Sequence, residues 1–245
     1  MARAARRSRH VLIVLTAVAA TIALPRLARA AGGAYQVDTS DVTAGACKVE
    51  SWVSSAANRD VIAAVNPACA FVMLRPVEFG MQMTRTRTDD EWSSGMTPKI
   101  KANLVPSGIG TFGIAVSTTA GFDPNSRENT SLAFTAPLTM RLSEDVRINL
   151  NAGWLLDRTV ERHYFTYGAS IDWRTHDNLY TFTAEVFGQS GAAEESSVIR
   201  PRFQAGVRWR PIDEFSIDVI YGHNIAGENA NWITIDTVIR FSPPR

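Results

Sequence analysis

After residue 30 the chain has no long hydrophobic run: no stretch reaches about eighteen consecutive apolar residues. This absence argues against a membrane-spanning helix, because such a helix needs about 20 predominantly apolar residues. Only helices and closed β-barrels satisfy all backbone hydrogen bonds in lipid. If this part of the chain lies in a membrane, it must therefore do so as a closed barrel.

The first thirty residues are predicted to be a secretory signal peptide. Arginines precede an apolar run at residues 11–24, which is too short to cross a membrane, and residues 28–30 form an A-x-A cleavage site. We expect export by the general secretory route with cleavage after Ala30. The alternative is an N-terminal membrane anchor.

Basic residues are scarce once this peptide is removed. The remaining chain has 19 basic and 24 acidic residues, a formal net charge of −5, and the whole sequence contains three lysines. Nucleic-acid binding domains carry a basic patch or stripe. The sequence therefore predicts no nucleic-acid partner.

Cysteine is also rare, with Cys47 and Cys69 as the two examples. Exported proteins reach oxidising compartments, where such a pair is expected to form a disulfide. We predict a Cys47–Cys69 disulfide near the periplasmic end of the first hairpin. Two unpaired thiols are the alternative.

What the chain has in abundance is strict alternation, seen most clearly in the stretch RPRFQAGVRWRP at residues 200–211. Apolar side chains such as Phe203 and Val207 fall on one face, and Arg202 and Arg208 on the other, which is the period of a β-strand. Two weaker strands, 47–55 and 60–72, would precede the clear ones. Twelve strands would put both termini on the periplasmic side, and ten is the fallback count. The other clear segments are 77–88, 96–105, 111–121, 129–140, 145–156, 163–173, 179–189, 215–224 and 231–241.

These strands favour a membrane barrel over the alternative, a soluble periplasmic β-barrel. They reach ten to twelve residues, near the ~9–11 that cross a bilayer at a tilt and longer than the ~5–6 of soluble sheets. Aromatic residues form two bands, as in the girdles of outer-membrane barrels. One band is Trp173, Tyr180, Trp209, Phe215 and Phe241, and the other is Trp154, Phe165, Tyr167, Phe203 and Tyr221.

We therefore predict an all-β fold, a closed antiparallel up-and-down transmembrane β-barrel in the outer membrane. Residues 31–46 are expected to be a flexible periplasmic segment and residues 47–245 the barrel; whether the segment plugs the lumen is left open. Outer-membrane lipid and the barrel-assembly machinery are the expected partners. Three prolines within proposed strands, Pro98, Pro137 and Pro201, conflict with this pattern, because a closed barrel has no edge strand.

The polar faces are expected to line a wet lumen. Counting outward from the connections places Arg208 opposite Asp218, Arg202 opposite Glu185 and Arg147 opposite Asp172. Such pairs are expected because an unpaired charge in a confined lumen is costly. The charged residues predicted to face the lumen are Glu78, Lys99, Lys101, Arg147, Asp172, Glu185, Arg202, Arg208, Asp218, Asp236 and Arg240.

The sequence also resembles a known family. The pattern NLNAGWLLDRTVERHYFTYG, followed by AEVFGQ and RPRFQAGVRWRPIDEFSIDVIYGHNIAGENANWIT, is similar to small proteobacterial outer-membrane barrels of the "MetA-pathway of phenol degradation" family. The start ACKVESWVS fits the same group. The resemblance covers most of the chain after residue 30 and is strongest from residue 145. It implies an outer-membrane barrel with a transport role and implies no particular substrate.

An enzyme is the rival interpretation, but the residues for it are few. His163, His176 and His223 are better interpreted as girdle or turn residues than as bases. Asp218 and Asp236 could mark a catalytic or cation site, although the lumen arginines can neutralise them. We predict no catalytic residues, no cofactor and no metal site. The predicted function is a narrow channel or transporter for small solutes. The alternatives are a structural or stress-related envelope barrel without conductance and an outer-membrane lipid-acting hydrolase.

Overall fold

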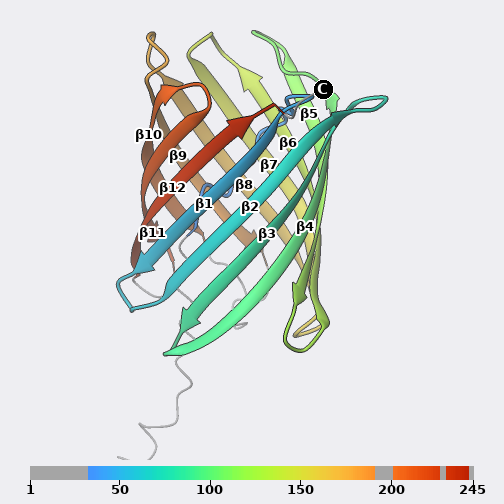
Figure 1. Ribbon diagram of the computed structural model, residues 1–245, viewed down its shortest axis with the longest axis vertical. Helices are drawn as coiled ribbons and strands as arrows, with labels where there is room; N and C mark the ends of the chain where they lie inside the picture. Colours follow the sequence, from blue (N-terminus) through green and yellow to red (C-terminus); the bar gives the residue numbers. More distant parts are fainter. Residues whose placement is uncertain (1–32, 191–200, 227–229, 243–245) are drawn as a thin grey trace, which may run out of the picture.

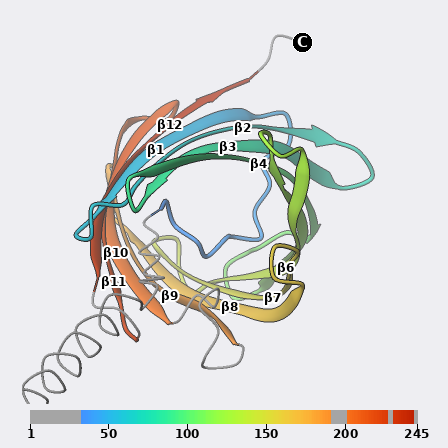
Figure 2. The same ribbon diagram turned by 90° about the horizontal axis from the view of Figure 1, so that it is seen from below.

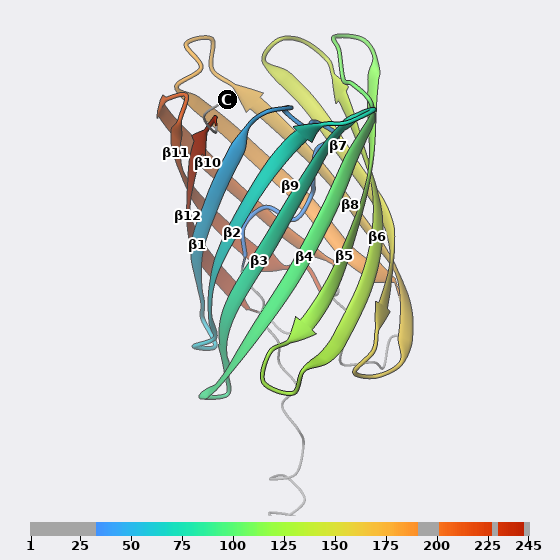
Figure 3. The same ribbon diagram turned by 45° about the vertical axis from the view of Figure 1, so that its right-hand side comes forward.

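The computed structural model describes residues 33–190, 201–226 and 230–242, so the predicted signal peptide and its cleavage site lie outside the described residues. These residues form a closed barrel of antiparallel strands (Figures 1 and 3). The strands are β1 (Cys47–Ala56), β2 (Val61–Val72), β3 (Pro76–Thr88), β4 (Glu91–Val105), β5 (Phe112–Asp123), β6 (Glu128–Arg141), β7 (Val146–Asp157), β8 (Arg162–Arg174), β9 (Tyr180–Ser190), β10 (Arg202–Ile212), β11 (Phe215–Asn224) and β12 (Asn231–Phe241).

The twelve-stranded up-and-down topology is confirmed. Each strand pairs with its neighbours in the sequence, and β1 pairs with β12 to close the ring. β4 begins at Glu91 rather than at residue 96, because the weakly alternating residues 91–95 still pair with β3. Among the described residues no helix is long and apolar enough to cross a membrane.

The apolar faces of the strands point outward. On β11, Asp218 and Ile220 are fully buried, whereas Val219 is 50% exposed and Tyr221 is 49% exposed. This is the reverse of a soluble protein, in which apolar side chains line the interior. It is the arrangement of a barrel whose outer wall meets lipid.

Three of the prolines within the strands each interrupt one of the two neighbouring ladders. Pro67, Pro98 and Pro137 lie inside strands, and each has a register partner on one side and none on the other. Pro137 pairs with Asn151 of β7, for example, while the β5–β6 register skips this position. Because proline has no N–H to donate, the closed barrel accepts it as a local gap in one ladder. Pro201 lies just before β10.

The predicted disulfide is present and joins the first two strands. Cys47 and Cys69 are direct register partners, with their Cα atoms 4.0 Å apart. Cys47 also lies opposite Phe241, the last residue of β12. The disulfide therefore sits at the end of the barrel where the closing strands meet.

The described residues before β1 run inside the barrel (Figures 2 and 3). We call residues 33–46 the lumen segment. Residues 31–46 are predicted to be a flexible periplasmic segment, with the question of whether it plugs the lumen left open, and the described part of that stretch lies within the ring of strands. The physical reason is that its backbone groups form no regular secondary structure of their own and find partners on the polar inner wall.

Candidate functional site: the polar lumen

The polar faces of the strands carry many charged side chains. Each of the eleven charged residues predicted for the lumen lies on the polar face of its strand, and six of them are buried. Lys48 Nζ on β1 lies 3.0 Å from Glu78 Oε2 on β3, so this ion pair crosses β2. Arg240 donates to Ser216 Oγ at 3.2 Å. The six buried residues are Lys101, Asp172, Glu185, Arg202, Asp218 and Asp236.

Two of the three expected cross-strand ion pairs are present. Arg208 Nε lies 2.9 and 3.0 Å from the two carboxylate oxygens of Asp218. Arg147 Nε donates to Asp172 Oδ2 at 2.6 Å. Both pairs join residues that are direct register partners, so Arg147 and Arg208 are each held by a carboxylate of a neighbouring strand.

The third prediction, that Arg202 lies opposite Glu185, is wrong, because the register differs by two residues. Arg202 lies opposite Phe187, and Gln204 takes the place opposite Glu185. The guanidinium of Arg202 packs over the Trp232 ring, 5.8 Å from its centroid. The register across β9 and β10 depends on the length of their connection, which the sequence pattern alone did not fix.

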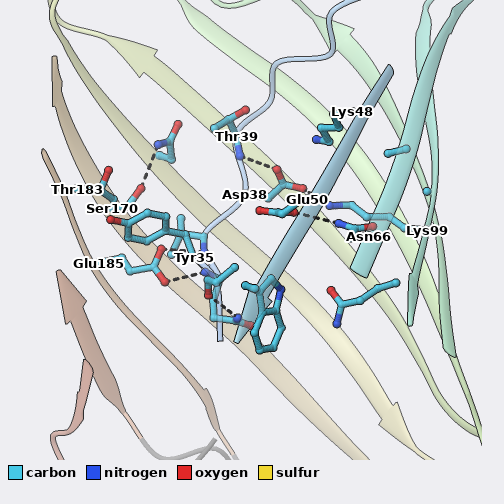
Figure 4. A pocket seen from close by; sticks show the side chains of 18 of the residues that line it. Tyr35, Asp38, Thr39, Lys48, Glu50, Asn66, Lys99, Ser170, Thr183 and Glu185 are labelled. Atoms are coloured by element: carbon cyan, nitrogen blue, oxygen red, sulfur yellow. Dashed lines mark hydrogen bonds and ion pairs between the residues drawn. The ribbon is translucent and has the colours of Figure 1, made fainter. Parts of the chain in front are cut away.

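Glu185 instead holds the lumen segment. Its Oε1 accepts from the backbone N–H of Gln36 at 2.7 Å and its Oε2 from that of Val37 at 3.0 Å (Figure 4). Gln204 Nε2 donates to both Glu185 Oε1, at 2.7 Å, and the carbonyl of Ala34, at 3.1 Å. Two buried wall residues thus fix the beginning of the lumen segment through its main chain.

A second main-chain anchor lies further along the lumen segment at Ser40. Its N–H donates to Thr139 Oγ1 at 2.8 Å, and its carbonyl accepts from Asn103 Nδ2 at 2.7 Å. Thr139 in turn donates to Asn149 Oδ1 at 2.8 Å. This anchor ties the lumen segment to β4 and β6, across the barrel from β9 and β10.

The two aspartates of the lumen segment bind basic residues of the wall. Asp38 Oδ1 accepts from Lys101 Nζ at 2.8 Å, and its other oxygen accepts from Lys99 (Figure 4). Asp41 Oδ2 lies 2.7 Å from an Arg141 guanidinium nitrogen and 3.7 Å from one of Arg147. Each aspartate therefore lies between two cations.

These contacts set the protonation of the lumen segment. Burial alone would raise the pKa of the Asp38 carboxyl, but the charges and hydrogen bonds of Lys99 and Lys101 outweigh burial and hold that pKa well below its usual range. Burial raises the pKa of the Tyr35 phenol, and the charge of Asp218 raises it further. Asp38 is therefore charged and Tyr35 neutral around neutral pH.

A cavity of about 350 Å³ lies between the lumen segment and the wall. A second cavity of about 150 Å³ lies beside the β6–β7 turn and is lined by arginines of four strands. Both signs of charge line the larger cavity, so it suits ions and small polar solutes better than apolar ones. Its charged lining residues are Asp38, Lys48, Glu50, Glu78, Lys99, Arg147, Asp172, Glu185 and Arg208.

The residues considered for an enzyme have other contacts. His163 stacks on Trp154 with ring centroids 5.3 Å apart, and His223 Nδ1 lies 2.5 Å from Asn231 Oδ1. Asp218 and Asp236 are direct register partners, and Arg208 neutralises Asp218. Across the described ranges no group of three or more His, Cys, Asp or Glu side chains is arranged to hold a metal ion.

The barrel is similar to solved outer-membrane proteins. An outer-membrane channel named COG4313 from Pseudomonas putida F1 matches with a TM-score of 0.63 and 11% identity, over 85% of this chain and 100% of that one. The NanC porin matches with a TM-score of 0.61 and 6% identity, over 78% and 98%. Outer membrane phospholipase A from Escherichia coli matches with a TM-score of 0.52 and 8% identity, over 87% and 95%.

At these identities the matches show a shared fold, one that hosts both channels and an enzyme. No curated protein sequence matches the chain. A family model does match, over residues 19–241, which includes the whole barrel. The chain therefore belongs to the family described as "Uncharacterised conserved protein UCP029691".

Proposed function

We propose that the protein is a narrow outer-membrane channel for small polar solutes. The observation that carries this proposal is a charged lumen with a cavity of about 350 Å³ inside a barrel whose outer wall is apolar. Channels among its structural neighbours share this fold. The resemblance to the "MetA-pathway of phenol degradation" barrels agrees with transport and supplies no substrate.

The remaining features of the proposal come from the sequence. Export with cleavage after Ala30 and insertion by the barrel-assembly machinery follow from the signal-peptide pattern and the barrel fold. The even strand number supports a periplasmic location for both the start of β1 and the end of β12. Outer-membrane lipid is the expected surrounding of the apolar wall.

One observation favours a second candidate, an envelope barrel that does not conduct. The lumen segment occupies part of the bore and is anchored at Glu185, Thr139 and Asn103. A barrel filled in this way could serve a structural role, with its interior closed to solutes. The lumen segment therefore has to be tested directly.

Conductance in planar bilayers separates the candidates. We expect the full exported chain to give discrete current steps and a variant without residues 33–45 to give larger ones. Conduction by the deletion variant alone would identify a plugged barrel. If neither protein conducts above the empty bilayer, the channel proposal is wrong. Release of fatty acid from phospholipid vesicles would instead identify a hydrolase.

A further inference from the structure

The wall residues around Asp38 form a small anion site. Lys99 and Lys101 are two residues apart on β4, so both side chains leave the same face of the sheet. Each binds a different oxygen of the Asp38 carboxylate. The Lys101 side chain is 4% exposed, and a buried cation of this kind requires an anionic partner. The wall here is built to hold one carboxylate.

A second anion site lies near the end of β6. Arg141 and Arg147 are direct register partners on β6 and β7, although like charges in that position repel each other. Asp41 lies between them, and its other oxygen accepts from Ser107 Oγ at 2.6 Å. Asp172 binds Arg147 from the neighbouring strand. The carboxylate of Asp41 thus offsets the repulsion between Arg141 and Arg147.

Both sites border open space. The cavity of about 350 Å³ is lined by Asp38, Lys99 and Arg147, and the cavity of about 150 Å³ by Arg141 and Arg147. A small solute in these cavities would therefore meet Lys99, Arg141 and Arg147, three of the four cations that the two aspartates now bind, with the buried Lys101 behind Lys99 on the same strand. Charge-assisted hydrogen bonds to Lys and Arg are the main means by which proteins recognise carboxylates.

We propose that these two basic pairs are carboxylate-binding subsites of the permeation path, and that Asp38 and Asp41 occupy them until a solute carboxylate takes their place. The inference rests on the proposed channel function and names its solute class: small molecules that carry one or two carboxylates. The aspartates of the lumen segment would compete with such solutes for the two basic pairs.

The contacts of the lumen segment make such an exchange feasible. Its main chain is held by Glu185 and Gln204 at one position and by Thr139 and Asn103 at another. These anchors use backbone groups and are separate from the aspartate side chains. A solute can therefore displace a carboxylate by a change of side-chain rotamer, without release of the whole segment.

The test compares the parent with the double variant D38N/D41N, using succinate as the probe. A matched control is D89N/D90N, which makes the same change of charge at two exposed residues of the β3–β4 turn, where both residues have positive φ and asparagine is well tolerated. Succinate binding to each purified barrel in detergent micelles is measured by titration calorimetry. The reversal potential in a potassium chloride gradient is measured in planar bilayers.

We expect D38N/D41N to bind succinate about tenfold more tightly than the parent and to shift the reversal potential toward anion selectivity. The control D89N/D90N should match the parent, and K99Q/K101Q in the D38N/D41N background should lose most of the binding. If D38N/D41N does not fold, D38N alone serves the same comparison.

Equal succinate binding by D38N/D41N and the parent, or binding by neither, would overturn the inference. Calorimetry does not require conduction, so the two proposals fail separately. Binding without any current would contradict the channel, whereas current without binding would contradict the carboxylate subsites.

Discussion

Arg208 on β10 and Asp218 on β11 face each other across neighbouring strands, and Arg208 Nε lies within 3.0 Å of both carboxylate oxygens. The Asp218 side chain is 0% exposed and the Arg208 side chain is 20% exposed. The Asp218 carboxylate depends on Arg208 for its counter-charge, because a side chain that is 0% exposed has no contact with solvent to replace a lost partner.

Removing the carboxylate of this pair is expected to destabilise the barrel. The variant D218N should lower the free energy of unfolding by about 3–5 kcal/mol, because it leaves the largely buried Arg208 charge uncompensated. Urea unfolding followed by tryptophan fluorescence measures this change. The double variant R208M/D218L, which removes both charges, should lie much closer to the parent. An equal loss in both variants would show that the pair itself is not the cause.

A charged substitution on the outward face should destabilise the barrel more at the middle of the membrane than at its rim. Val219 lies in the middle of β11, paired with Val207 and Ile235 on either side, and is 50% exposed. We expect V219R to lower the free energy of unfolding in lipid by about 2–4 kcal/mol. The rim variant I212R, at a residue that is 58% exposed beside a turn, should lower it by about 0–1 kcal/mol. Similar effects at the two positions would contradict the assignment of a lipid-facing wall.

Gly222 is expected to tolerate no side chain. A Cβ at this position would overlap the ring of Trp232, which is 1% exposed and donates to Gln204. G222A should therefore destabilise the barrel by about 1–3 kcal/mol through overpacking and change the tryptophan fluorescence. The control G80A introduces a Cβ whose nearest neighbour is 3.3 Å away, so its effect should be smaller. A harmless G222A variant would show that the Trp232 ring can move.

The lumen segment should loosen in acid. The pKa of Asp38 lies well below its ordinary value near 3.9, so its stabilising contribution is complete above that ordinary value and is lost as the pH falls toward the lowered one. The difference in free energy of unfolding between the parent and D38N should be constant above about pH 5 and shrink below about pH 4. A difference that grows in acid would mean that Lys99 and Lys101 do not control this carboxyl.

The strands and the inner charges could be predicted because alternation is a local property. β11 and β12 have the bounds that their pattern indicated, and a short turn fixes Arg208 against Asp218. The connection between β9 and β10 is longer, and the partner of Arg202 on β9 is Phe187, two residues from the predicted Glu185. A slip of two residues keeps every side chain of the strand on the same face, so Arg202 has a different partner without changing the side of the sheet to which it points.

The lumen segment could not be located from its own residues. It is short, polar and aperiodic, and such a pattern is as typical of a free tail as of a buried strap. Its place depends on residues far away in the chain, including Glu185 and Thr139. The basic pairs that hold Asp38 and Asp41 were visible as inward charges, but nothing local indicated that their partners precede the first strand.

The position of the lumen segment also bears on how the barrel is assembled. The segment is continuous with β1, and the pairing of β1 with β12 completes the ring around it. A segment inside a closed ring must either be in place before the seam between β1 and β12 forms or be drawn in afterwards through an open end of the barrel. By either route, the entry of the lumen segment into the barrel is a kinetic step separate from the pairing of the strands.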